Sequence, residues 1–131
     1  NIRAYRKHWP EMVASEISET VAIMRWLIES GVDVTLLTNF AADTFREAQA
    51  MYPFLTETRG VTVSGEVKVL KPDPQIYRIH TEDFSLDPPA TLFIDDSAAN
   101  VEGAKAFGWQ AVLFEGPKKL RRDLSAFGLA V

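Results

Sequence analysis

Apolar positions along the chain follow helical and strand-like spacing in turn, and this pattern predicts the secondary structure. Helical spacing begins after Ser15, an expected N-cap, and ends before Gly31, an expected helix stop. Short runs rich in apolar and β-branched residues predict strands over residues 32–37, 60–64, 91–94 and 110–114. Further helices are predicted over residues 41–52, 74–81, 98–107 and 117–127, whereas residues 65–70 are expected to be extended.

This order of elements predicts an α/β fold with a Rossmann-like parallel sheet and helices on both of its faces. Helix and strand alternate along the chain, with no repeat, low-complexity tract or internal domain break. Right-handed crossovers bring the carboxyl ends of parallel strands to one edge of the sheet. We therefore expect Thr38, Asp95 and Asp96 to meet at that edge, with Lys71 close by.

The composition is that of an ordinary globular domain, and it narrows the range of partners. Of the 131 residues, 47% are hydrophobic and 24% are charged, and the net charge of −4 argues against nucleic acid or an anionic membrane as a partner. The absence of cysteine excludes disulfides and thiol chemistry. No apolar run is long enough to span a bilayer, and no charged start precedes an apolar segment, so we expect a cytoplasmic protein. A small phosphorylated partner stays compatible with this charge, because a local site can be basic.

Two adjacent carboxylates, Asp95 and Asp96, follow directly on the strand predicted for residues 91–94. They repel each other, and hard oxygen ligands of this kind suit Mg²⁺. The Thr38 hydroxyl can donate to a phosphate oxygen, and Lys71 supplies positive charge for a developing negative one.

Each of these residues also has a purely structural explanation. Thr38 can cap the helix that follows it, Asn39 can be a turn residue, and Lys71 can be a solvated loop lysine. Asp96 or Ser97 can cap the helix after the acid pair. Taken together, their order and spacing favour a phosphate and metal site.

The succession LLTN, KPDPQIY and LFIDDSAANVEGAKAFG resembles the haloacid dehalogenase superfamily of hydrolases, from about residue 16 to the C-terminus. The roles that this resemblance implies follow the order of its motifs. Thr38, Asn39 and Lys71 would bind the substrate and its phosphate. Lys71, which would also hold the nucleophile, and Asp95 would be the catalytic residues. Asp95 and Asp96 would hold the metal, with Asp96 favoured as the direct ligand, and Ser97 and Asn100 would support that pair.

One departure from the family concerns its nucleophile, the first aspartate of an Asp-x-Asp pair after an N-terminal strand. No Asp-x-Asp occurs in these 131 residues. The resemblance implies that this strand lies between the strands ending at Thr38 and Asp95, so its absence would expose two sheet edges. We therefore interpret residues 1–14 as the end of a cap or a linker, and residues 15–131 as the core without its first strand. The chain is expected to be the C-terminal part of a longer enzyme, inactive alone, completed by an N-terminal segment or by a second copy.

The paired acids favour one activity of the family over another. The dehalogenases that name the superfamily need no metal and carry small polar residues where this chain has Asp95 and Asp96. We therefore expect Mg²⁺-dependent hydrolysis of a small phosphate monoester through an aspartyl-phosphate. The alternatives are a 2-haloacid dehalogenase and a non-catalytic domain of the same fold. A two-component receiver domain is disfavoured, because its acid pair precedes its threonine and lysine, whereas here Thr38 and Lys71 come first.

Overall fold

The chain divides into two compact units, each continuous in space. Unit 1 combines Asn1–Val32 with Glu115–Val131, and unit 2 is formed by Asp33–Phe114. A computed structural model describes residues 9–129, so any expectation for residues 1–8 lies outside the described part. Along the described chain helices and strands alternate as predicted, and the α/β fold class is confirmed. The division of the chain into residues 1–14 and 15–131 stays a prediction.

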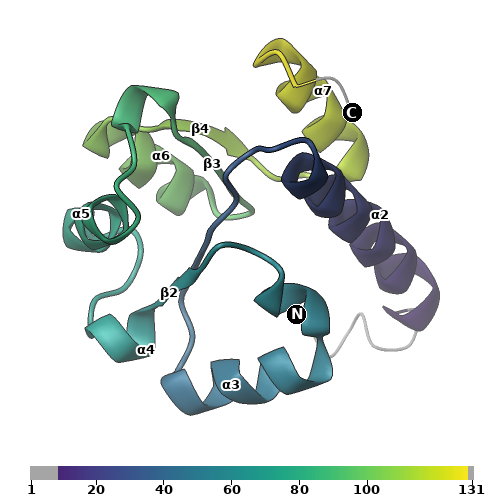
Figure 1. The fold of residues 1–131 in the computed structure, drawn as a ribbon, viewed down its shortest axis with the longest axis horizontal. Coiled ribbons are helices and arrows are strands. Elements are labelled where there is room, and N and C mark those ends of the chain that lie inside the picture. Colours follow the sequence, from purple (N-terminus) through teal and green to yellow (C-terminus); the bar gives the residue numbers. More distant parts are fainter. Residues whose placement is uncertain (1–8, 130–131) are drawn as a thin grey trace. The chain divides into compact units, whose positions relative to one another are not determined.

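Unit 1 contains two helices, α2 (Trp9–Glu29) and α7 (Pro117–Ala126), which lie side by side (Figure 1). Apolar side chains at helical spacing, Ile23 and Leu27 on α2 and Leu120 and Leu124 on α7, are buried. Among the helices within residues 9–129, none is long and apolar enough to cross a membrane.

The start of α2 differs from the prediction. The helix begins at Trp9, so Ser15 lies inside it and is not its N-cap. Pro10 occupies the first turn, where a backbone N–H has no partner within the helix, so proline is compatible with this position. The end of α2 is as predicted: Gly31 has φ +87°, and the Val32 amide donates to the Leu27 carbonyl at 3.0 Å to close the last turn.

Unit 2 contains four short parallel strands arranged as two separate pairs. Strand β1 (Leu36–Thr38) pairs with β2 (Val61–Val63), and β3 (Leu92–Asp95) pairs with β4 (Gln110–Leu113). In the described part of the chain, β1 and β3 do not pair with each other. Strand β1 is shorter than the predicted run of residues 32–37, because the Val32 amide is used by the end of α2.

Six helical segments connect these strands (Figure 1). They are α3 (Ala42–Met51), the 3₁₀ turn η1 (Pro53–Thr56), α4 (Ser64–Val67), α5 (Pro74–Asp83), the 3₁₀ turn η2 (Pro88–Ala90) and α6 (Ala98–Phe107). Helix α5 begins as its sequence predicts, since the Asp73 carboxylate accepts a hydrogen bond from the Gln75 amide at 2.9 Å.

The prediction that residues 65–70 are extended is wrong, because the helical turn α4 occupies their start. Gly65 packs so closely on the turn after β1 that a Cβ there would lie 2.6 Å from the Ala42 nitrogen. The Lys68 amide closes the turn on the Ser64 carbonyl at 2.7 Å, with Lys68 in the left-handed conformation (φ 61°). The contact of Gly65 with the turn after β1 is long-range, and local spacing does not reveal it.

The core of unit 2 is aromatic and lies between α5, α6 and the β3–β4 pair. The ring of Tyr77, which is fully buried, contacts those of Phe93, Phe107 and Trp109 at centroid distances of 5.1 to 6.1 Å. Their edge-to-face and tilted packing fixes α5 and α6 against the strands. Asp95, at the end of β3, and Lys71, shortly before α5, are therefore positioned by well-packed elements.

His80 on α5 links that helix to the β1–β2 pair. Its imidazole lies within hydrogen-bond distance of the Thr35 hydroxyl (2.8 Å, Nε2) and of the Thr62 hydroxyl (2.7 Å, Nδ1). The side chain is buried, and burial lowers its pKa to about 4. The imidazole is therefore neutral near pH 7 and serves as a structural link.

Candidate active site

A buried lysine–carboxylate pair forms the centre of the site. The Lys71 Nζ lies 2.6 Å from Oδ2 of Asp95, and the two side chains are only 9% and 7% exposed. The same Nζ donates to the Leu37 carbonyl oxygen at 3.1 Å and lies 5.5 Å from the centroid of the Phe93 ring. Because Leu37 belongs to β1 and Asp95 to β3, Lys71 connects the two strand pairs of unit 2.

The side of β1 that Lys71 reaches is its unpaired edge. The Leu36 amide donates to the Gly60 carbonyl, so the backbone of Leu36 faces β2, and the backbone of the next residue, Leu37, faces away from it. The Asp95 carbonyl accepts from the Phe114 amide on the side of β4. The lysine ammonium thus satisfies a carbonyl that no described strand pairs.

Asp95 is held by three donors. Its Oδ1 accepts from the Ser97 amide at 2.8 Å, its Oδ2 accepts from Lys71, and the Asn100 side-chain amide lies 3.3 and 3.4 Å from the two oxygens. Burial alone would raise the pKa of Asp95, but these hydrogen bonds and the charge of Lys71 outweigh it and hold the pKa below its ordinary value. Asp95 is therefore an ionised partner for Lys71, and its lone pairs are already largely engaged.

Asp96 differs from Asp95 in both its exposure and its bonding. Its side chain is exposed and makes no hydrogen bond or ion pair with any side chain or backbone group in the described residues. The helix cap is Ser97, whose Oγ accepts from the Asn100 amide at 3.3 Å. Of the two adjacent acids, Asp96 has the carboxylate that is free to bind a cation.

The residues after β1 meet the loop of Lys71. Oδ1 of Asn39 accepts from the Lys71 amide at 2.9 Å, and Nδ2 of Asn39 donates to the Lys71 carbonyl at 3.3 Å. Thr38 ends β1 and is half-buried, and its hydroxyl has no hydrogen-bond partner within the described residues. It does not cap α3, whose N-cap is Ala41 and lacks a side-chain bond. Its hydroxyl thus stays available for a ligand.

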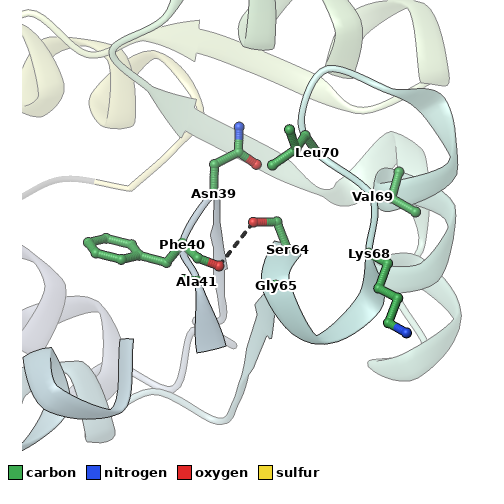
Figure 2. Close-up of a pocket in the computed structure, with 8 residues that line it drawn as sticks. All are labelled: Asn39, Phe40, Ala41, Ser64, Gly65, Lys68, Val69 and Leu70. Atoms are coloured by element: carbon green, nitrogen blue, oxygen red, sulfur yellow. Dashed lines mark hydrogen bonds between the residues drawn. The ribbon is translucent and has the colours of Figure 1, made fainter. Parts of the chain in front are cut away.

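A pocket of about 360 Å³ borders the site on the side of the loop before Lys71 (Figure 2). Its lining combines the turn after β1 with the α4 segment: Asn39, Phe40, Ala41, Ser64, Gly65, Lys68, Val69 and Leu70. Figure 2 shows the Ser64 hydroxyl donating to the Phe40 carbonyl (3.2 Å), while the Lys68 side chain points away from Asn39. The sequence does not predict this pocket, because it depends on the helical turn α4.

Two supporting residues are also not foreseen from the sequence pattern. The Tyr77 hydroxyl donates to the Asn100 carbonyl at 2.8 Å, and burial together with the charge of Asp95 raises the pKa of Tyr77 to about 12. A Cβ at Gly103 would lie 2.8 Å from Cβ of Pro72 and 3.1 Å from the Tyr77 hydroxyl. A glycine inside a helical run is the sequence signal that points to such a close approach.

Comparison with known proteins identifies the family of the chain. A family model described as haloacid dehalogenase-like hydrolase matches residues 7–108. A phosphatase of Mycobacterium tuberculosis, MT3486, is 31% identical over 103 residues, which are 75% of this chain and 48% of the relative. The (S)-2-haloacid dehalogenase 1 of a Pseudomonas species is 34% identical over 59 residues, which are 44% of this chain and 26% of the relative. The chain thus spans less than half the length of these relatives.

A solved structure shares this arrangement of elements. An enzyme of the HAD family from Bacteroides thetaiotaomicron, in complex with magnesium and inorganic phosphate, aligns with a TM-score of 0.66 and 28% identity. The alignment covers 73% of this chain and 51% of that one.

Proposed function

The chain belongs to the haloacid dehalogenase-like hydrolases, and from this premise we propose that it forms the phosphate- and metal-binding part of a phosphohydrolase acting on a small phosphate monoester. One observation carries the proposal: a buried Lys71–Asp95 pair stands beside a second carboxylate, that of Asp96, which is free. A relative that is named a phosphatase and a related enzyme solved with magnesium and phosphate support it.

Three residues of this chain have distinct roles in the proposed reaction. The Lys71 ammonium, fixed between β1 and β3, stabilises negative charge on the nucleophile and on the transferred phosphoryl group. The Thr38 hydroxyl, at the end of β1, donates to a phosphate oxygen. Asp95 keeps the Lys71 ammonium oriented through a hydrogen bond of 2.6 Å.

The nucleophile must come from outside the described residues, because the sequence contains no Asp-x-Asp. In the proposed reaction an aspartate carboxylate attacks phosphorus, the ester P–O bond breaks, and the alcohol leaves with a proton from a general acid. Water then attacks the aspartyl-phosphate, which releases inorganic phosphate and restores the carboxylate. The unpaired edges of β1 and β3 are where a strand bearing this aspartate fits, and without it we expect no turnover.

The acids that are present fit a magnesium site only in part. Asp96 offers a free carboxylate, whereas Asp95 is engaged by Lys71, Ser97 and Asn100. No cluster of three or more His, Cys, Asp or Glu side chains is found among the described residues. Mg²⁺ commonly keeps several waters and uses one or two carboxylates, so Asp96 would hold it, and the strand that carries the nucleophile in the proposed reaction would supply a further ligand. Bound there, the ion would screen the substrate's charge from the enzyme carboxylates.

The proposal is tested on the protein as its own cells make it. Its intact mass is measured first, because a mass well above 14.7 kDa would show that a further segment accompanies this chain. Phosphate release from a panel of small phosphate monoesters is then followed with Mg²⁺ and with EDTA. Release that requires Mg²⁺ and is lost in Asp96→Asn supports the proposal, and release that is indifferent to both contradicts it.

A second candidate is hydrolytic dehalogenation of a 2-haloacid. It is favoured by the match to a 2-haloacid dehalogenase over 59 residues. It is disfavoured by Asp96, a free acid with no evident use in a metal-free reaction. Halide release from 2-haloacids in the presence of EDTA would select this activity and exclude the phosphohydrolase.

A further inference from the structure

We infer that Asn39 is a positioning residue whose side-chain amide fixes the backbone of Lys71 and thereby aims the lysine ammonium at Leu37 and Asp95. The inference deepens the proposed function, since it rests on Lys71 being the charged group of that site. It differs from the role that family resemblance implies for Asn39, which is contact with the substrate.

The geometry is a two-point clamp between one side chain and one backbone unit. Oδ1 of Asn39 accepts from the Lys71 N–H at 2.9 Å, and Nδ2 donates to the Lys71 C=O at 3.3 Å. A carboxamide carries a donor and an acceptor on two separate atoms, so it can satisfy both groups of one residue, whereas an ionised carboxylate has no donor. Two bonds to one residue fix its orientation as well as its position.

Lys71 needs such a clamp because regular secondary structure does not hold it. It lies between α4, which ends at Val67, and α5, which begins at Pro74. Its long side chain loses much rotamer freedom when Nζ is held between Leu37 and Asp95. When the Lys71 backbone is already fixed, its side chain has fewer conformations to lose on reaching Leu37 and Asp95. The ammonium is then better preorganised.

The clamp also ties the lysine to the strand end that carries the phosphate-binding hydroxyl. Asn39 follows Thr38 directly, and Lys71 Nζ returns to the carbonyl of Leu37, one residue before Thr38. The loop is thus attached to the end of β1 at two points, one on each side of Thr38. Asn39 therefore sets the distance between the two groups proposed to contact phosphate.

The test compares three variants of the protein, in the form that its own cells make and without substrate, by NMR. Asn39→Ala removes the clamp, and Asn39→Ser keeps a short polar side chain that cannot span both atoms. Thr91→Val is the matched control: it removes a hydroxyl–carbonyl bond (to Asp87, 2.8 Å) at the opposite end of β3. The signals followed are hydrogen exchange of the Lys71 amide and the protected ammonium resonance of Lys71.

If Asn39 positions Lys71, both Asn39 variants speed exchange of the Lys71 amide by about fivefold or more, as expected for loss of one ordinary hydrogen bond, and broaden or abolish the ammonium resonance. Thr91→Val leaves both signals as in the parent chain. Parent-like Lys71 signals in Asn39→Ala and Asn39→Ser would overturn the inference.

Titration with inorganic phosphate then separates this inference from the proposed function. If Asn39 only contacts the ligand, its loss weakens phosphate binding and leaves the Lys71 signals of the free chain unchanged, which also overturns the positioning role. If phosphate binds none of the variants nor the parent chain while the Lys71 signals change as expected, the positioning role stands and the phosphate-binding proposal for this chain fails.

Discussion

Replacement of Lys71 by methionine removes the ammonium and keeps an unbranched apolar side chain in its place. In the folded chain this change leaves the Asp95 carboxylate, 7% exposed, with the Ser97 amide and the Asn100 side chain as its remaining donors. It also leaves the Leu37 carbonyl without the ammonium that it binds at 3.1 Å. The substitution therefore tests how strongly a buried pair holds β1 and β3 in place.

The expected loss of unfolding free energy at pH 7 is about 3 kcal/mol. Removing one member of a buried ion pair typically costs about 3–5 kcal/mol, because the other charge stays buried without compensation. Two donors remain on Asp95 and reduce this cost, whereas loss of the bond to Leu37 adds about 1 kcal/mol. Asp95→Asn combined with Lys71→Met removes both charges, so the double variant should be less destabilised than the sum of the single ones.

The pH dependence has a definite sign. In the parent chain the pKa of Asp95 lies below its ordinary value, so the stability that the pair contributes is present above that value and is lost as the pH falls through the lower, folded pKa. In Lys71→Met burial dominates and the pKa of Asp95 rises. The difference in unfolding free energy between the parent chain and Lys71→Met is therefore largest near neutral pH. It shrinks in acid, where Asp95 of the variant is protonated.

Urea denaturation followed by circular dichroism at pH 7 and pH 4 measures both effects. Arg78→Met is the matched control, because it removes an ion pair, to Glu82, whose side chains are 73% and 61% exposed, and such pairs contribute at most about 1 kcal/mol. The reasoning fails if Lys71→Met costs no more than Arg78→Met at pH 7, or if its cost is the same at both pH values.

Three further outcomes are expected. Gly103→Ala should lower the unfolding free energy in urea by about 1 kcal/mol, because a Cβ 2.8 Å from that of Pro72 costs about 1–3 kcal/mol while the gain in helix propensity is about 1 kcal/mol. The unfolding free energy should fall by up to about 3 kcal/mol between pH 6.5 and pH 4. The reason is that burial lowers the pKa of His80 to about 4 in the folded chain, so the imidazole of the unfolded chain binds a proton at a higher pH than that of the folded chain. Urea melts of His80→Gln should lack most of this fall. Asp96→Asn should abolish Mg²⁺ binding in calorimetric titrations of the active protein and shift its urea midpoint very little, because the side chain makes no bond within the described residues.

The elements that the sequence predicts well are those with local signals. Asp73 caps α5 because its own side chain reaches the Gln75 amide, and Gly31 ends α2 because the backbone there needs a positive φ. The ends of β3 and β4 follow from short apolar runs bounded by polar or turn residues. Each of these signals lies within a few residues of the feature that it predicts.

The features that the sequence does not predict depend on contacts between distant segments. The turn α4 depends on the close packing of Gly65 on the backbone of Phe40–Ala42, a segment that lies far earlier in the chain. The clamp of Asn39 on Lys71 joins residues that are 32 apart in sequence. Motif order placed Asn39 at the site, but only the folded backbone shows that its amide is turned toward the lysine.

The two adjacent acids make the described site negatively charged, because only one of them is paired with the lysine. Lys71 is already paired with Asp95, so the described groups of the site carry one positive and two negative charges, and Asp96 leaves the site with a net negative charge. A phosphate monoester would be repelled by this arrangement. A divalent cation on Asp96 would reverse the sign and let the fixed ammonium act on an anion that the site would otherwise exclude. The charge balance of the folded residues therefore favours a metal-dependent reaction, independently of the named relatives.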